Sequence, residues 1–172
     1  MTTSGPSRLM CALHNICHVV VPAGILVALG ILGFVVCDLM FSETIRQDAP
    51  LTVERARQIG CPIPLPEDAT RVRFAVYHHW GKSETYLRFN ADTAICKEWV
   101  ATILDANKGS PEQVRLQNIT TPPVIKSWGE LGPLTWFNIS RIMVGSFSTG
   151  GPRGPEIWID NDRGIFYYRL MY

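Results

Sequence analysis

A run of 19 residues without a charged side chain, VVVPAGILVALGILGFVVC from Val19 to Cys37, constrains this chain more than any other feature. At about 1.5 Å of rise per residue, a helix of this run would be roughly 28 Å long, close to the roughly 30 Å hydrocarbon core of a bilayer. Pro22 near its start is compatible with a helix, because the first turn needs no backbone donor there. The run predicts a transmembrane helix over residues 19–41, behind a short N-terminal tail of residues 1–18.

Two other kinds of segment share part of this pattern. A cleaved signal peptide has a hydrophobic region of about 7 to 15 residues followed by small residues, whereas this run is longer and continues through Asp38 to Phe41. A lipoprotein signal has small residues before its lipidated cysteine, and neither Cys11 nor Cys37 is preceded by them. We therefore expect an uncleaved signal anchor, and a single-pass membrane protein that contacts lipid through residues 19–41.

Two features disagree about the side of the membrane that carries the rest of the chain. The positive-inside rule finds one arginine before the run and three soon after it (Arg46, Arg55 and Arg57), which favours a cytoplasmic domain. However, acidic residues dilute this charge, and the globular part holds two of the five cysteines, an even number that permits one disulfide in an oxidising compartment. We expect an extracytoplasmic domain with a disulfide between Cys61 and Cys96.

The segment after the membrane run divides into a stalk and an arm. Residues 42–60 predict a short helical stalk, because Pro50 can open a helix and Thr52 can cap it. The stretch CPIPLPEDAT then places three prolines close together, which fixes φ and forces an extended path. This arm begins a globular domain over residues 61–172, and the predicted disulfide would tie it to the first turn of the next helix.

Two hairpins are expected in the globular domain. Alternation of side chains from Arg71 to Trp80 predicts a strand that is half buried against a core. Gly81 to Ser83 fits a hairpin loop, and Thr85 to Asn90 returns as a second strand. Near the C-terminus, EIWIDNDRGIFYYRL predicts another hairpin that turns at Asn161 to Gly164.

The fold class follows from what lies between these hairpins. A helix from Asp92 or Thr93 to about Asn107 is indicated by a capping residue and by apolar residues at helical spacing. The order of strands, helix and strands predicts an α+β domain, in which a small antiparallel sheet is covered by one main helix.

The region between this helix and the last hairpin gives weaker signals. Residues 110–135 are rich in proline and glycine and predict an irregular connection, with one short strand near residues 114–119. Residues 134–147 are ambiguous, and we expect a strand there, followed by a loop tip at residues 145–154.

The adjacent pair His78 and His79 is the best candidate for chemistry, with Glu84 across the hairpin as a third group. Zinc takes three or four ligands from well-spaced positions, and the sequence has no HExxH or paired CxxC pattern. Adjacent residues on a strand also point to opposite faces, so the two histidines cannot easily bind one ion. We expect no metal or cofactor site, and a structural pair in which His78 is wholly or partly buried and His79 is exposed.

Other motifs give weaker evidence of a functional site. CALHNICH groups two cysteines and two histidines before the membrane run, where no fold surrounds them. GSFSTGGPRG could cradle an anion, but Pro152 and Pro155 deny the helix that a phosphate loop needs. Asn118 and Asn138 begin glycosylation sequons, which matter only in an exported eukaryotic protein. A net charge of +1 with mixed signs disfavours nucleic-acid binding.

Aromatic residues on the outer face of the predicted strands form a separate candidate. Four aromatic residues fall opposite the expected core: Tyr77, Trp158, Tyr167 and Tyr172. Such a patch can bind a protein partner, or it can pack a second layer of the same chain.

Several motifs together suggest a family. CPIPLPEDATRVRF, YLRF, IWID and RGIFYY, within about Cys61 to Tyr168, resemble small uncharacterised bacterial single-pass membrane-anchored proteins. The resemblance supports the architecture and implies no activity. We expect a non-catalytic binding or scaffolding domain at a membrane. The alternative is a metal-binding or hydrolytic accessory protein that uses His78, His79 and Glu84.

Overall fold

The structure is a computed structural model that describes residues 23–37, 42–106, 116–149 and 154–172. The chain divides into two units, residues 1–41 and residues 42–172. In the first unit, residues 23–37 form an α-helix. Among the described residues, no helix combines the length and the apolar character needed to cross a membrane. The predicted tail (1–18) and both ends of the predicted span (19–22 and 38–41) lie outside the described residues.

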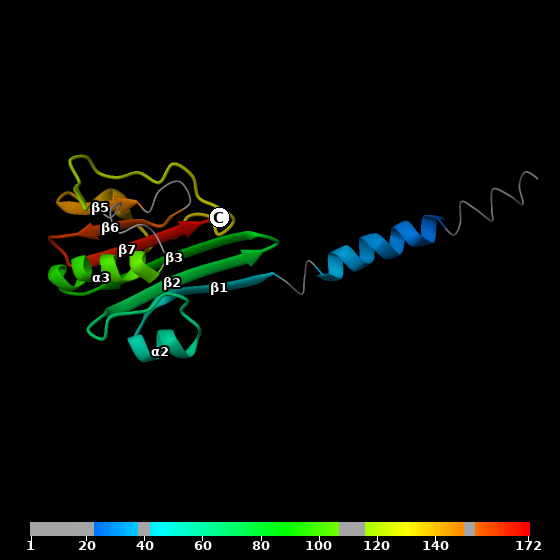
Figure 1. Cartoon of the computed structure of the whole chain (residues 1–172), viewed down its shortest axis with the longest axis horizontal. Coiled ribbons are helices and arrows are strands. Elements are labelled where there is room, and N and C mark those ends of the chain that lie inside the picture. Colours follow the sequence, from blue (N-terminus) through cyan, green and yellow to red (C-terminus); the bar gives the residue numbers. More distant parts are fainter. Residues whose placement is uncertain (1–22, 38–41, 107–115, 150–153) are drawn as a thin grey trace, which may run out of the picture. The chain divides into compact units, whose positions relative to one another are not determined.

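The second unit is built on one seven-stranded sheet in which all neighbouring strands are antiparallel (Figure 1). The spatial order is β1-β2-β3-β7-β6-β5-β4. The strands are β1 (Glu43–Leu51), β2 (Thr70–His79), β3 (Lys82–Asn90), β4 (Gln117–Asn118), β5 (Gly145–Thr149), β6 (Glu156–Asp160) and β7 (Ile165–Met171). The predicted α+β class with an antiparallel sheet is confirmed, and the sheet is wider than expected.

Both predicted hairpins are present. The first turns at Trp80 and Gly81, whose φ angles of 38° and 81° are both positive, as in the type I′ turn that suits a two-residue hairpin. The expected loop at Gly81 to Ser83 was therefore slightly late. The second hairpin joins β6 to β7 through residues 161–164, where Gly164 has a φ of 58°.

One face of the sheet, here called the helix face, is covered by α3 (Thr93–Ala106), α2 (Val53–Gln58) and the proline arm. The Asp92 carboxylate accepts a hydrogen bond from Ala94 N at 2.8 Å at the start of α3, as the sequence predicted for a cap. Buried aliphatic and aromatic side chains fill this core, including Phe74, Leu87, Val100, Ile103, Ile157 and Phe166.

The prediction of a helical stalk over residues 42–60 is wrong for most of that segment. Glu43–Leu51 forms the edge strand β1, which pairs with β2 and belongs to the same compact unit as the rest of the sheet. Only Val53–Gln58 is helical, and Thr52 caps it by accepting a hydrogen bond from Arg55 N at 3.2 Å. Pairing with β2 overrides the weak helical pattern before Thr52 because a ladder of backbone hydrogen bonds outweighs local propensity.

The other face of the sheet, here called the loop face, is covered by residues 116–144, the covering segment (Figure 1). This segment is mostly irregular and contains one short 3-10 helix, η2 (Ile139–Arg141). The strand expected over residues 134–147 begins only at Gly145, and the one near residues 114–119 is limited to β4, with residues 114–115 outside the described part. Apolar residues at 134, 136, 137, 139 and 142 are buried without alternation, so they cover the sheet instead of joining it.

Candidate functional site

The histidine pair does not form a metal site in the described part of the chain. His78 is opposite Ser83 and His79 is opposite Lys82 in the β2–β3 register, so the two imidazoles lie on opposite faces. His78 is exposed and His79 is half-buried, the reverse of the predicted burial. Among the described residues, no group of three or more His, Cys, Asp or Glu side chains is placed to hold a metal ion.

Glu84 has a structural partner on the covering segment. Its carboxylate is buried and accepts hydrogen bonds from Glu130 N at 2.7 Å and Leu131 N at 3.4 Å. Gly129 passes so close that a methyl group there would collide with this carboxylate. Glu84 therefore holds the turn at residues 129–132 against the sheet, which leaves the alternative function at His78, His79 and Glu84 without support from the geometry.

The predicted disulfide between Cys61 and Cys96 is absent, because both cysteines are free thiols. Cys96 is fully buried and its thiol donates to Ala91 O at 3.8 Å, while the Cys61 thiol donates to Ile63 O at 3.6 Å. Burial raises the pKa of Cys61 to about 11 and that of Cys96 to about 12. Both groups are therefore neutral and poorly nucleophilic near neutral pH.

The proline arm is attached to its neighbours by side-chain hydrogen bonds. Trp99 on α3 donates its indole Nε1–H to Pro64 O at 3.2 Å, and Arg57 on α2 donates to Leu65 O at 3.1 Å. These two bonds satisfy carbonyl groups that have no strand partner in the extended arm. These hydrogen bonds hold the arm against α3 and α2, where the sequence had predicted a disulfide between the arm and the next helix.

The predicted aromatic surface is mostly internal. Trp158 and Tyr167 are only 5% and 3% exposed, because the covering segment packs on them. Phe137 of that segment meets both rings edge-on, at 6.1 Å from Trp158 and 5.4 Å from Tyr167. Tyr77 stays half-buried beside His79, and Tyr172 is exposed. The second of the two sequence interpretations, a further layer of the same chain, therefore fits the loop face.

Other predicted motifs are outside or away from any site. CALHNICH (residues 11–18) and residues 150–153 of the glycine-rich loop lie outside the described residues. The described start of that loop, Gly145–Thr149, is strand β5. Of the two sequon asparagines, Asn118 is exposed on β4, whereas the Asn138 side chain accepts a hydrogen bond from Ser140 Oγ at 2.7 Å.

Four arginines converge on a pocket of about 230 Å³ on the loop face. Arg73 from β2 and Arg88 from β3 face each other directly in the strand register. Arg141 from η2 and Arg163 from the last hairpin turn complete the set. The remaining wall is formed by residues Thr135, Trp136, Asn138, Ile165 and Tyr167.

The electrostatics of this arginine pocket are unusual for a structural cluster. Like charges directly opposite on neighbouring strands destabilise a sheet. The Nε atoms of Arg73 and Arg88 are buried, and neither has a hydrogen-bond partner in the described parts of the chain. Burial, and then the charges of Arg88 and Arg71, lower the pKa of Arg73, and Asp48 only partly opposes this. The pocket therefore presents unsatisfied, positively charged donors.

Neighbouring groups hold two of the four arginines, Arg88 and Arg163, in place. The Arg88 guanidinium lies 5.8 Å from the centre of the Tyr167 ring, within the range of a cation–π contact. Burial raises the pKa of the Tyr167 phenol, while the charge of Arg88 and a side-chain hydrogen bond with Arg88 oppose this rise. Arg163 is fixed by Asp160, with 3.0 Å between Nε and Oδ2, and donates to Arg141 O.

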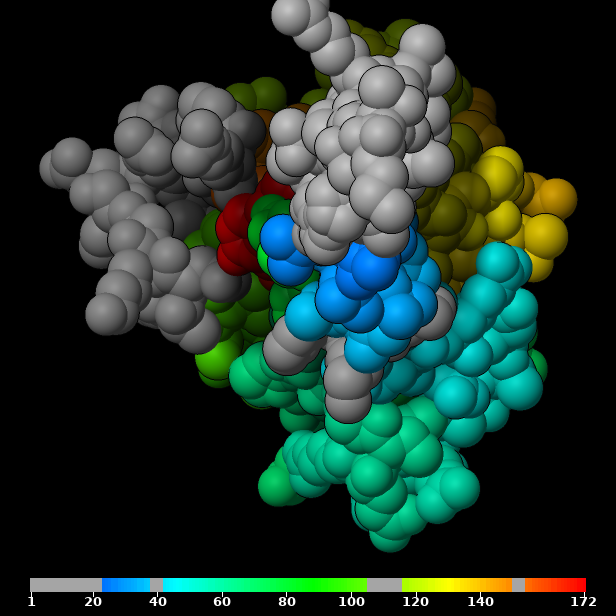
Figure 2. Space-filling model, turned by 90° about the vertical axis from the view of Figure 1, so that its right-hand side faces the viewer, coloured from blue at the N-terminus to red at the C-terminus, as the bar shows by residue number. Residues whose placement is uncertain are grey.

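The first strand of the unit also supports this pocket. Trp136 donates its indole Nε1–H to Asp48 Oδ1 at 2.7 Å, which joins the pocket wall to β1. Figure 2 shows residues of β1, in cyan, beside yellow residues of the covering segment at the surface of the unit. Asp48 is already paired with Arg46 at 2.9 Å, so it neutralises little of the pocket's charge.

Arg169 shows how a buried arginine of this sheet looks when the chain itself supplies its partners. Its Nη1 lies 3.1 Å from Glu156 Oε2, its Nη2 donates to Ser127 O at 2.6 Å, and its guanidinium lies 5.8 Å from the centre of the Tyr86 ring. A carboxylate thus neutralises this side chain and its two Nη atoms have partners, although its Nε, like those of Arg73 and Arg88, is buried without a hydrogen-bond partner among the described residues. At Arg73 and Arg88 an external anion could take that role.

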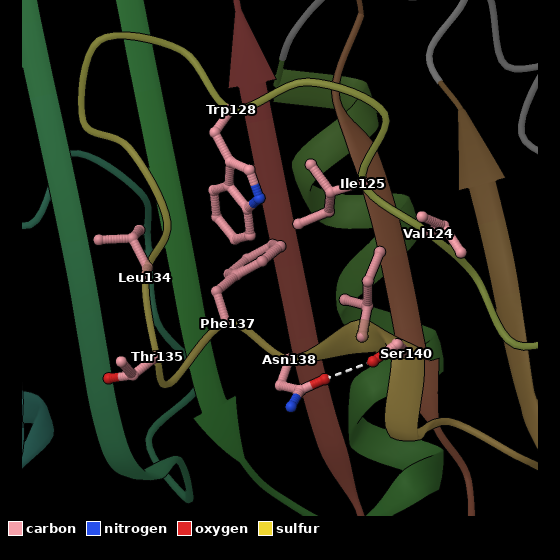
Figure 3. Close-up of a pocket in the computed structure, with 9 residues that line it drawn as sticks. Val124, Ile125, Trp128, Leu134, Thr135, Phe137, Asn138 and Ser140 are labelled. Atoms are coloured by element: carbon pink, nitrogen blue, oxygen red, sulfur yellow. Dashed lines mark hydrogen bonds between the residues drawn. The ribbon is translucent and has the colours of Figure 1, made fainter.

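A second, apolar pocket of about 290 Å³ adjoins the arginine pocket. In Figure 3 the side chains of Trp128, Ile125 and Phe137 face one another, while Thr135 points away from Phe137. Thr135 and Asn138 line both pockets. The charged pocket and the apolar pocket are therefore neighbours, and the same residues of the covering segment line both.

The sequence did not single out the four arginines, since no motif joins residues 73, 88, 141 and 163. One signal was available. Once the turn is placed at Trp80 and Gly81, the two-residue hairpin register sets Arg73 opposite Arg88, a pairing of like charges that calls for a partner. Arg141 reaches the pocket only through the path of the covering segment, which the sequence does not specify, and Arg163 reaches it from the β6–β7 turn.

Compared with protein families, curated proteins and solved structures, the chain matches none of them. The resemblance to small bacterial membrane-anchored proteins therefore stays a prediction. The candidate site is defined by its geometry alone.

Proposed function

We propose that this chain is a non-catalytic, membrane-anchored binding protein whose globular unit binds an anionic group in the arginine pocket. The observation that carries the proposal is the pair Arg73 and Arg88, which face each other with buried Nε atoms that lack a hydrogen-bond partner among the described residues. Burying a charged donor without a partner is unfavourable. A bound anion would remove both the repulsion and the unmet hydrogen bonds.

The chemistry of the group follows from its donors. Guanidinium groups match carboxylate, sulfate and phosphate oxygens with two parallel hydrogen bonds, and such charge-assisted bonds are stronger than neutral ones. A pocket of about 230 Å³ admits one such group with little else. The lining side chains include no carboxylate or histidine that could act as a general base beside a bound anion. This supports binding as the proposed activity.

The location is part of the same proposal. The uncharged run within residues 19–41 supports an anchor in lipid, and large domains that follow such anchors are commonly exported, which favours an extracytoplasmic globular unit. The bacterial resemblance agrees with this arrangement. A protein partner at the membrane that presents an acidic group is one way in which the pocket could be filled.

Isothermal titration of the purified full chain with inorganic phosphate and with sulfate tests the anion site. Arg141 is exposed and lines the pocket, so Arg141→Glu should weaken binding by roughly 10-fold or more, as expected for loss of a charge-assisted hydrogen bond plus repulsion. Lys97 is exposed on α3, which covers the helix face. Lys97→Glu therefore makes the same charge change away from the pocket and should leave anion binding unchanged.

The salt dependence supplies a second readout, because an anion held by several arginines competes with chloride. Binding that is absent from the unmodified chain, or that Arg141→Glu and Lys97→Glu weaken equally, would contradict the proposal.

A further inference from the structure

The two pockets of the loop face are neighbours on the covering segment. The arginine pocket and the apolar pocket share Thr135 and Asn138 in their linings. Both residues lie on the covering segment, and Thr135 is exposed. A ligand that crosses this segment at Thr135 would place one end among the guanidinium groups and the other in the apolar pocket.

The apolar pocket has little to offer a polar ligand. Apolar side chains form most of its wall, namely those of Val124, Ile125, Trp128, Leu134, Phe137 and Ile139. Its two polar side chains on the lower rim, Asn138 and Ser140, are hydrogen-bonded to each other at 2.7 Å (Figure 3). Val124 lines this pocket and is 73% exposed, so the apolar lining continues to the surface.

We infer that the ligand is a free single-chain anionic amphiphile, with its phosphate or carboxylate head in the arginine pocket and its alkyl chain in the apolar pocket. This inference rests on the proposed function, because it assigns the remaining part of a ligand whose anionic group is already placed. The charge of the arginine pocket selects the head, and the apolar lining selects the chain.

The size and the polarity of the recess favour this class over its competitors. A pocket of about 290 Å³ accommodates part of one alkyl chain, and a two-chain lipid would leave its second chain in water. An acidic peptide would bring backbone N–H and C=O groups that need partners, and most of the wall of the apolar pocket offers none.

The experiment is a titration of the full chain in uncharged maltoside micelles with inorganic phosphate, butyl phosphate and hexyl phosphate, with empty micelles as the blank. A buried methylene contributes roughly fourfold to an equilibrium constant. Hexyl phosphate has two more methylenes and should therefore bind roughly 15-fold more tightly than butyl phosphate, and more tightly still than phosphate.

Two matched variants test where the alkyl chain of the ligand binds. Val124→Asp places a charge at the mouth of the apolar pocket and should abolish the gain from the longer chain while leaving phosphate binding intact. Met143→Asp makes the same change at an equally exposed position that lines neither pocket, and should retain the gain.

The outcomes separate this inference from the proposed function. Phosphate binding without any dependence on chain length overturns the amphiphile and leaves the anion site standing. No binding of any of the three compounds overturns both. Displacement of hexyl phosphate by phosphatidic acid in the micelles, or by a capped acidic peptide, at equal or lower concentration reassigns the recess to a two-chain lipid or to a protein partner and overturns the inference.

Discussion

The two faces of the sheet are covered in different ways. On the helix face, α2 and α3 satisfy their own backbone hydrogen bonds and bury a core of aliphatic residues and phenylalanines. On the loop face, an irregular segment covers a cluster of large aromatic rings centred on Phe137, together with buried charged groups. Regular elements close the helix face, whereas the irregular segment leaves recesses on the loop face.

This difference accounts for where the candidate site lies. A helix packs its apolar stripe against a sheet with few gaps, so the helix face offers mainly hydrophobic contacts. The covering segment approaches the sheet through single side chains such as Phe137 and through hydrogen bonds such as those at Glu84. Between these contacts, Arg73 and Arg88 can face a recess instead of a packed layer.

The largest expected effect is at Phe137, which meets the rings of five aromatic residues: Tyr86, Trp128, Trp136, Trp158 and Tyr167. Phe137→Ala should lower the free energy of unfolding by about 3–5 kcal/mol, because it removes a fully buried ring and leaves a cavity. Denaturant titration measures this loss.

A matched cavity on the helix face sharpens the comparison. Ile103→Ala on α3 should also destabilise, by about 2–5 kcal/mol, but without weakening phosphate binding. If Phe137→Ala leaves phosphate binding unchanged while Ile103→Ala abolishes it, phosphate binding does not depend on the loop face as we propose.

The next effect concerns the buried carboxylate of Glu84. Glu84→Ala should cost about 2–3 kcal/mol of stability, because two backbone N–H groups of the covering segment lose a charged acceptor. Gly129→Ala should also destabilise, since its methyl group would collide with that carboxylate.

A double-mutant cycle tests whether these two residues act together. In the Glu84→Ala background the collision is gone, so Gly129→Ala should destabilise the protein less. The loss of stability in the double mutant should differ from the sum of the single losses by about 0.5–3 kcal/mol. Strictly additive losses would show that Glu84 does not hold the turn at Gly129.

Alkaline pH provides a test of the two buried thiols on the helix face. Cys61 and Cys96 have raised pKa values of about 11 and about 12, against the ordinary value of 9.0. Above pH 9 the unfolded chain releases these thiol protons and the folded chain retains them, so stability should fall between pH 9 and pH 11. The loss should be on the order of 1–2 kcal/mol for each thiol.

Cys61→Ser isolates one of these contributions. Because serine does not ionise in this range, the variant should lose less stability between pH 9 and pH 11 than the unmodified chain. An equal loss in both proteins would assign the alkaline effect to other groups. In addition, both thiols should react with a thiol reagent in denaturant without prior reduction, whereas a disulfide would prevent this.

The smallest expected effect is at the proline arm. Trp99→Phe removes the hydrogen bond to Pro64 O while keeping an aromatic ring, and should cost about 0.5–1.5 kcal/mol. Hydrogen exchange of the amides that flank the arm should increase more than exchange in β3. Uniform loss of protection across the unit would show that Trp99 acts through the core instead.

The helix face was largely predictable from the sequence. Alternation in β2, the cap at Asp92 and the turn before Gly164 are local signals that tertiary contacts reinforce. The stalk prediction failed because β1 is specified by pairing with β2, a distant segment in the sequence. The disulfide prediction failed because an even number of cysteines shows neither their distance nor their burial.

The loop face was not predictable in the same way. The covering segment carries apolar residues such as Leu134, Trp136 and Phe137 without the period of a helix or a strand, so its path depends on the rings that it meets. The arginine pocket depends on this path at Arg141 and on the exact hairpin register at Arg73 and Arg88. Only the register could be derived from local signals.

The most direct measurement is a nitrogen-15 NMR titration of the full chain with labelled arginine, observing the Nε–H signals while phosphate is added. The signals of Arg73 and Arg88 should move downfield and exchange more slowly with water, because their unpaired donors acquire an acceptor. The Arg46 signal should stay in place, because its Nε already donates to Asp48 at 2.9 Å. Signals of Arg73 and Arg88 that do not respond, or that respond no more than Arg46, would contradict an anion site on the loop face.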